Sequence, residues 1–252
     1  MEISAVIITY NEERNIGRCL QSLAGIADEI IVVDSFSTDA TESVAKKYPV
    51  RWEQHAFDGF WQQKNRANGL ATHDWILSLD ADEALSEPLR TALIHLKKNR
   101  VESDGQPGAY SLNRLTNYCG QWIHHSGWYP DRKTRLFDRR KARWGAQNPH
   151  ERLLTDKDVQ TAHIQGDLLH YSYYTVSEHL ERSRKYADMA VAHQLAQGRA
   201  GAWWRVLVHP AAKFLRNYFL KGGFLDGKAG FTICRIAALE TYWKYRGLMK
   251  RS

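Results

Sequence analysis

Three apolar segments in the first third of the chain, each followed by a polar cluster, constrain the fold more than any other feature. The segments are ISAVIIT (3–9), EIIVVD (29–34) and DWILSLD (74–80). Each has the length of a strand and is nearly all apolar, which is typical of strands buried on both faces of a parallel sheet. The pattern therefore predicts an α/β fold with helices flanking a mostly parallel sheet.

Segments with helical features alternate with these strands. We expect helices at 11–23, 37–48 and 59–71 and a further strand at 50–55. Asn11 is the expected cap of the first helix, and Asp39 with Glu42 has the spacing of a capping box in the second. The alternation supports repeated strand–helix units rather than an all-helical or all-β fold.

The strand at 74–80 ends in a cluster of acids, because Asp80, Asp82 and Glu83 follow one another within four positions. The other two apolar strands also end in polar residues, at 9–13 and 34–39. In open parallel sheets the ligand binds beyond the carboxyl ends of the strands. We therefore expect the three polar clusters to share one site.

Asp80 and Asp82 can converge on one Mg²⁺ or Mn²⁺ ion, because carboxylates at i and i+2 leave a strand close together. Such a cation prefers oxygen ligands and also binds diphosphate. The alternative is that Asp82 and Glu83 only precede a helix capped by Ser86. Spacing alone does not separate these interpretations.

Composition limits the class of protein. The chain has 252 residues and 43% hydrophobic content, enough for one domain or one domain with an appendage. Its three cysteines, Cys19, Cys119 and Cys234, are far apart, which argues against a disulfide framework or a zinc cluster and favours the cytosol. We expect neither a secretion signal nor a membrane-spanning segment.

The net charge of +7 comes from the C-terminal segment 199–252, which holds 11 Lys and Arg against Asp226 and Glu240. Apolar residues recur there at helical spacing, as in Trp204, Leu207, Val208, Ala211, Leu215 and Tyr218. We predict a basic amphipathic helical extension, with two helices or a kink at Pro210 and a second helix over 231–251. It suits an anionic membrane surface, although its apolar side could equally pack on the domain.

Three stretches, in this order and spacing, resemble glycosyltransferase family 2 with its GT-A (Rossmann-like) fold: AVIITYNEERNIGRCLQSL, EIIVVDSFSTDAT and QQKNRANGLATHDWILSLDADE. The resemblance implies a nucleotide-sugar-binding half at 1–98, an acceptor-side half at 109–198 and a helical tail at 199–252. Residues 135–153 and 166–190 are more weakly similar to the acceptor-side segments of small, soluble bacterial members. Within the family, the chain resembles the lipopolysaccharide inner-core enzymes that add β-1,4-glucose to the first heptose.

The resemblance also implies roles for residues on the donor side. Thr9, Tyr10 and Glu12 would line the nucleotide pocket, and Asp34 would contact the uracil or the ribose. Lys64 would approach the base or the diphosphate.

Four further residues would carry the chemistry. Asp80 would hold the ribose or a metal-bound water, and Asp82 would bind Mg²⁺ or Mn²⁺. His170 would complete the metal site, the alternative being a satisfied core histidine. Glu151 would take the proton from the acceptor hydroxyl, the alternative being a surface glutamate paired with Arg152.

The expected function is that of an inverting, metal-dependent transferase using a UDP-sugar, with glucose as the expected sugar and a lipopolysaccharide core heptose as acceptor. We expect it at the cytoplasmic face of the inner membrane as a peripheral protein. Another UDP-sugar, for capsule or other glycan synthesis, is one alternative. A basic nucleic-acid-binding protein and a non-catalytic sugar-nucleotide sensor are others; we expect no nucleic acid partner, because positions 1–198 are close to neutral.

Overall fold

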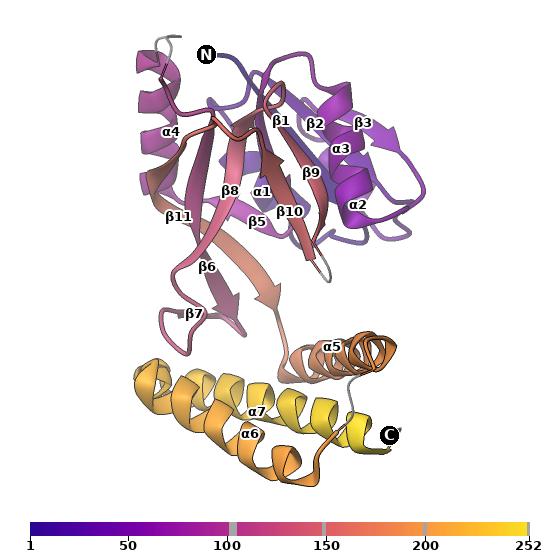
Figure 1. The fold of residues 1–252 in the computed structure, drawn as a ribbon. Helices are drawn as coiled ribbons and strands as arrows, with labels where there is room; N and C mark the ends of the chain where they lie inside the picture. Colours follow the sequence, from indigo (N-terminus) through magenta and orange to yellow (C-terminus); the bar gives the residue numbers. More distant parts are fainter. Residues whose placement is uncertain (101–104, 148–149, 199–200, 251–252) are drawn as a thin grey trace. The chain divides into compact units, whose positions relative to one another are not determined.

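The computed structural model describes residues 1–100, 105–147, 150–198 and 201–250, which form two compact units (Figure 1). Unit 1 comprises Met1–Arg114 and Asp131–His170. Unit 2 comprises Leu115–Pro130 and Tyr171–Ser252. The predicted division at 98/109 and 198/199 stays a prediction, and residues 101–104 and 199–200 of those boundaries lie outside the described residues.

Four parallel strands form one end of the main sheet, in the order β3 (Arg51–Gln54), β2 (Glu29–Asp34), β1 (Ile3–Thr9) and β4 (Trp75–Asp80). The predicted parallel arrangement is therefore confirmed. Side chains alternate between the faces of β1: Ile3, Ala5 and Ile7 belong to one buried cluster and Val6 to another. Both faces are covered, which explains why these strands are almost all apolar.

The sheet continues beyond β4 in the order β8 (Asp131–Asp138), β6 (Ala109–Tyr118), β11 (Thr161–Tyr173) and β5 (Glu83–Leu85), with β7 (Gln121–Ile123) paired to β6. The β4–β8, β8–β6, β11–β5 and β6–β7 pairs are antiparallel. A separate two-stranded antiparallel sheet consists of β9 (Ala142–Gln147) and β10 (His150–Thr155). The whole is a mixed α/β fold of the GT-A type, as predicted.

The helices of unit 1 are α1 (Ile16–Ser22), α2 (Thr41–Ala45), α3 (Phe60–Leu70) and α4 (Glu87–Asn99). The first begins five residues later than expected, because Asn11 has a left-handed backbone with φ of 53°. The predicted capping box of α2 is wrong. Asp39 accepts a hydrogen bond from the Thr41 N–H at 3.0 Å, and Ala40 occupies the cap position.

Ser86 caps α4 as predicted, its hydroxyl accepting a hydrogen bond from the Leu89 N–H. The interpretation of Glu83 as a residue that only precedes this helix is wrong, because Glu83 begins β5 and is fully buried. A carboxylate without access to water needs charged or hydrogen-bonding partners inside the protein. Those partners belong to the candidate site.

Unit 2 is mainly helical, with α5 (Val176–Ala196), α6 (Trp203–Leu215) and α7 (Gly227–Lys250). A π-helical segment, η1 (Arg216–Leu220), and a short 3-10 helix, η2 (Gly223–Asp226), connect α6 to α7. In the described part of the chain, no helix combines the length and apolar character needed to cross a bilayer.

Pro210 lies inside α6, so the predicted separation into two helices at this residue is wrong. A proline within a helix costs about 3 kcal/mol, which packing must offset. The neighbouring His209 ring stacks on Tyr245 of α7 with centroids 4.7 Å apart, and α6 packs along α7 in Figure 1. Several of the apolar residues predicted to form one stripe are exposed, namely Trp204, Leu207, Val208 and Leu215.

Candidate active site

The carboxyl ends of the parallel strands bring three predicted site residues to one edge of the sheet. Thr9 at the end of β1 lies beside Asp34 at the end of β2, and Ile8 lies beside Asp80 at the end of β4. This is the shared edge that a parallel sheet predicts. The roles assigned to these residues remain predictions.

Hydrogen bonds join the loops that follow β1 and β2. Asp34 is buried and accepts hydrogen bonds from the Ser37 N–H at 2.9 Å and from Gln54 Nε2 at 3.2 Å. Asn11 donates its N–H to Ser37 Oγ and accepts the Thr38 N–H, each at 2.8 Å. These hydrogen bonds hold the two loops together beside the strand ends, and we call residues 9–13 and 34–39 the braced rim.

The rim leaves polar and aromatic groups available to a ligand. The Thr9 hydroxyl is buried and has no hydrogen-bond partner among the described residues. Tyr10 is 58% exposed, an unusual amount for a large aromatic ring that directly follows a core strand. Glu12 lies further along the loop, where its carboxylate accepts a hydrogen bond from Asn15 Nδ2 at 2.8 Å.

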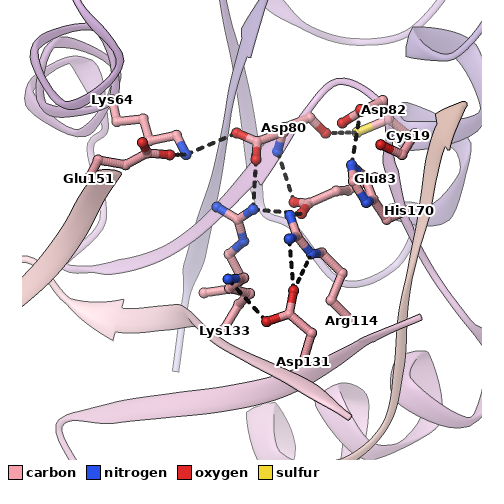
Figure 2. Close-up of polar contacts among 12 residues, drawn as sticks. Cys19, Lys64, Asp80, Asp82, Glu83, Arg114, Asp131, Lys133, Glu151 and His170 are labelled. Carbon is pink, nitrogen blue, oxygen red and sulfur yellow. Dashed lines mark hydrogen bonds and ion pairs between the residues drawn. The ribbon is translucent and has the colours of Figure 1, made fainter. Parts of the chain in front are cut away.

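Lys64 of α3 connects two predicted site carboxylates (Figure 2). Its Nζ lies 3.0 Å from Asp80 Oδ1 and 3.2 Å from Glu151 Oε1, and 4.6 Å from the centre of the Trp144 ring. The Lys64 side chain is only 2% exposed. A buried ammonium requires this kind of compensation. The fold thus joins Lys64, Asp80 and Glu151, which are far apart in the sequence.

Arg135 of β8 forms the second half of the charged cluster. Its guanidinium lies 2.7 Å from Asp80 Oδ2 and 2.5 Å from Glu83 Oε1, while the Asp80 N–H donates to Glu83 Oε2 at 3.0 Å. Arg114 lies 3.6 Å from Glu83 and forms hydrogen bonds to Asp131. Figure 2 shows this alternation of acids and bases from Glu151 to Asp131.

The charged cluster fixes protonation states. Burial alone would raise the pKa of Asp80, but the charges of Arg135 and Lys64 outweigh burial and hold that pKa well below its usual range. Burial likewise raises the pKa of Glu151, and Lys64 reverses this so that the pKa lies below its ordinary value. Both carboxyl groups are therefore ionised at neutral pH.

Asp82 and His170 form a separate pair. Asp82 Oδ2 lies 3.2 Å from His170 Nε2, and both side chains are mostly buried. Neighbouring ligands of an octahedral Mg²⁺ or Mn²⁺ are about 3 Å apart, so these two atoms fit adjacent positions on one cation. Among the described residues, no group of three His, Cys, Asp or Glu side chains can hold a metal ion. The remaining ligands would have to be diphosphate and water.

Asp80 and Asp82 do not share partners, although sequence spacing suggested that they could converge on one ion. Asp80 is engaged by Lys64 and Arg135, and Asp82 by His170. The arrangement fits the alternative role for Asp80, which is to hold the ribose or a metal-bound water.

Sequence reasoning missed Arg135, Arg114 and the burial of Glu83. Arg135 lies in a stretch with four other Lys or Arg residues, 135–143, where no local pattern distinguishes a buried arginine from exposed ones. Glu83 carried the one usable signal, because it stands in the acidic cluster that ends β4.

Fold and site together define an α/β enzyme whose charged site lies at the carboxyl ends of parallel strands. Residues 4–152 match the model of the family described as glycosyl transferase family 2. The chain belongs to this family and is a glycosyltransferase.

Curated relatives align over almost the whole chain. The chain is 29% identical to the lipopolysaccharide core biosynthesis glycosyltransferase LpsC of Rhizobium meliloti, over 97% of this chain and 93% of that protein. It is 27% identical to an uncharacterized glycosyltransferase of Rickettsia typhi, over 100% of this chain and 88% of that protein. Among solved structures, TarS 1–349 of S. aureus in complex with UDP is 16% identical with a TM-score of 0.44, covering 89% of this chain and 74% of that one.

Proposed function

We propose that this protein is an inverting, metal-dependent transferase that moves glucose from UDP-glucose to a heptose of the lipopolysaccharide inner core. The observation that carries the proposal is the pairing of Asp80 and Glu151 through one buried lysine at the end of β4. The relative named for lipopolysaccharide core biosynthesis supports the acceptor class. The site of action would be the cytoplasmic face of the inner membrane.

The donor would bind at the braced rim. Asp34 would contact the uracil or the ribose, with Thr9, Tyr10 and Glu12 lining the nucleotide pocket. The unpaired Thr9 hydroxyl and the exposed Tyr10 ring support this assignment, because a nucleoside offers hydrogen-bonding groups and a flat face to stack on. Asp80 would hold the ribose from the adjacent strand end, with Lys64 near the diphosphate.

Asp82 and His170 would hold a Mg²⁺ or Mn²⁺ ion together with the donor diphosphate. When bound, such an ion supplies positive charge where the departing diphosphate accumulates negative charge. The 3.2 Å separation of the two side-chain atoms supports this assignment.

Glu151 would act as the general base. An acceptor hydroxyl attacks the anomeric carbon, the bond from that carbon to the diphosphate oxygen breaks, and UDP leaves. The hydroxyl proton passes to a Glu151 oxygen, and the pairing with Lys64 supports this role because it keeps Glu151 ionised and fixes its orientation.

The proposal is tested by UDP release from a panel of UDP-sugars with truncated, heptose-containing lipopolysaccharide as acceptor. We expect release with UDP-glucose, dependent on acceptor and on Mg²⁺ or Mn²⁺, and near-complete loss in Asp82→Ala. Transfer from another UDP-sugar only, or to another acceptor only, would identify a different family 2 reaction. Full activity in the presence of a chelator would contradict the metal role.

The role of Glu151 is tested by the variant Glu151→Gln. We expect kcat to fall by about 10² to 10⁴-fold, because the amide cannot accept the proton, with UDP affinity close to that of the wild type. Glu42→Gln, an exposed glutamate paired with Lys46 on α2, is the matched control and should keep full turnover. Equal turnover in both variants would remove Glu151 from the mechanism.

A further inference from the structure

The connection between α6 and α7 exposes its large apolar side chains and buries small and polar ones. The last residue of α6 and four residues of the connection are between 49% and 84% exposed: Leu215, Phe219, Leu220, Phe224 and Leu225. Asn217, Gly223 and Asp226 in the same segment are buried. This is the reverse of the usual arrangement, and exposed apolar clusters of this kind mark interaction surfaces.

Polar contacts hold the connection in shape. The buried Asp226 carboxylate accepts hydrogen bonds from the N–H groups of His124 and His125 at 3.2 and 3.0 Å and from Ser126 Oγ at 3.2 Å. The Lys221 carbonyl accepts the Ser126 N–H at 3.0 Å. The connection is therefore anchored through its backbone and Asp226. Phe219 and Phe224 each contact the Tyr218 ring, and both rings still remain exposed, as do the three leucines.

Charge narrows the kind of partner. The connection exposes Arg216 and Lys221, and the first turn of α7 exposes Lys228, while the one acid of the connection, Asp226, is buried. We call these three cations and the five exposed apolar residues the turn surface. Unit 2 as a whole carries 14 Lys and Arg against 5 Asp and Glu, a net charge of +9, whereas unit 1 carries 21 against 23.

We infer that the turn surface inserts into an anionic lipid leaflet, with its Leu and Phe side chains among the lipid chains and its cations at the lipid phosphates. The inference deepens the proposed function and rests on it, since it names the residues by which the enzyme would reach a lipid-linked acceptor. Exposed aliphatic side chains flanked by Lys and Arg have the composition of interfacial membrane anchors.

Two other occupants fit less well. Basic proteins bind nucleic acid through phosphate contacts and, on single strands, through base stacking on aromatic rings; three of the five apolar residues are leucines, which contribute to neither. A second copy of unit 2 would bring two strongly positive surfaces together. An anionic membrane satisfies both the apolar and the charged components at once.

The test is sedimentation of the full-length protein with vesicles of phosphatidylcholine, alone or mixed with phosphatidylglycerol, without donor or acceptor. We expect the wild type to bind the mixed vesicles more tightly than the neutral ones, and less tightly as salt is raised. The double variant Leu220→Ser/Leu225→Ser should lose about tenfold or more in partition coefficient. Met189→Ser is the control, because Met189 is 57% exposed on α5, outside the turn surface.

Circular dichroism of the double variant should match the wild type, because both replaced leucines are exposed. Equal vesicle binding by the double variant and the wild type would overturn the inference. Binding to a single-stranded oligonucleotide but not to vesicles would overturn it, as would self-association abolished by the double variant. The vesicle test contains no sugar, so its result does not depend on whether the proposed sugar transfer takes place. If the protein transfers sugar to a detergent-solubilised acceptor but does not bind vesicles, the membrane role of the turn surface is overturned and the proposed function stands.

Discussion

At the scale of single residues, Lys64 decides how the candidate site is charged. An ammonium with 2% exposure is tolerated because it meets Asp80, Glu151 and the ring of Trp144. The same cation allows the carboxylates of Asp80 and Glu151 to remain ionised near each other; without it, their mutual repulsion would raise their pKa values. In the proposed mechanism, Lys64 is therefore a positioning residue for Glu151 as well as a candidate diphosphate contact.

Lys64→Met should raise the pKa of Glu151, because burial then acts without an opposing charge. The proposed mechanism requires ionised Glu151, so we expect the acid limb of the pH profile of kcat/KM to move to higher pH, and kcat/KM at neutral pH to fall by about tenfold or more. Arg66→Met, on the same helix but in an exposed ion pair with Asp58, is the control and should keep the wild-type profile. An unshifted acid limb in Lys64→Met would refute the link between the two residues.

At the scale of secondary-structure elements, Arg135 joins β8 to the end of β4 and the beginning of β5. Its partners are Asp80 and the fully buried Glu83, and β5 itself is only three residues long. Removing one member of a buried ion pair leaves an uncompensated charge, which costs far more than removing both. The ion pairs of Arg135 with Asp80 and Glu83 therefore fix the conformation of the acidic segment that follows β4.

Arg135→Met should lower the free energy of unfolding by about 3 to 5 kcal/mol, measured by urea denaturation. Adding Glu83→Gln should recover part of this loss, giving a coupling of at least about 1 kcal/mol in a double-mutant cycle. Arg132→Met, an exposed arginine on the same strand, should change stability by about 0.5 kcal/mol or less. Strict additivity of the two buried substitutions would mean that Arg135 and Glu83 do not interact.

At the scale of the whole molecule, unit 1 concentrates carboxyl groups that ion pairs and hydrogen bonds stabilise in the charged form. Although burial acts to raise their pKa values, the net shift is downward for Asp28, Glu29, Asp39, Asp80, Asp138 and Glu151. In unit 2, burial raises the pKa of Glu240. Acid should therefore act mainly on unit 1.

A carboxyl group with a depressed pKa in the folded state adds stability that is fully present above its unfolded pKa and is lost as the pH falls. For Asp80 the unfolded value is about 3.9, so the free energy of unfolding should fall steeply below about pH 4. The decline should be shallower in Asp80→Asn, measured by urea denaturation across this range. Identical slopes would show that Asp80 contributes nothing to acid sensitivity.

The order of apolar and polar residues was enough to predict the parallel strands and the edge where they end. A strand buried on both faces needs apolar side chains along its whole length. This requirement is met within one short segment of sequence, so it can be recognised in segments such as 3–9 and 74–80. Helix starts were predicted less well, because Asn11 is drawn into bonds with Ser37 and Thr38 from another loop. Those bonds depend on tertiary contacts that helix propensity does not encode.

The sequence by itself determined the fold class, the family resemblance and the acidic strand end, since these follow from local composition and spacing. Only the tertiary structure decided which cation meets which carboxylate. Arg135 and Asp80 are 55 positions apart, and Lys64 and Glu151 are 87 apart. It also decided that the apolar residues between α6 and α7 are exposed, because hydrogen bonds to Asp226 and to the Lys221 carbonyl hold that connection. Contacts between residues distant in the sequence depend on how the elements pack, and the local periodicity of apolar residues does not predict them.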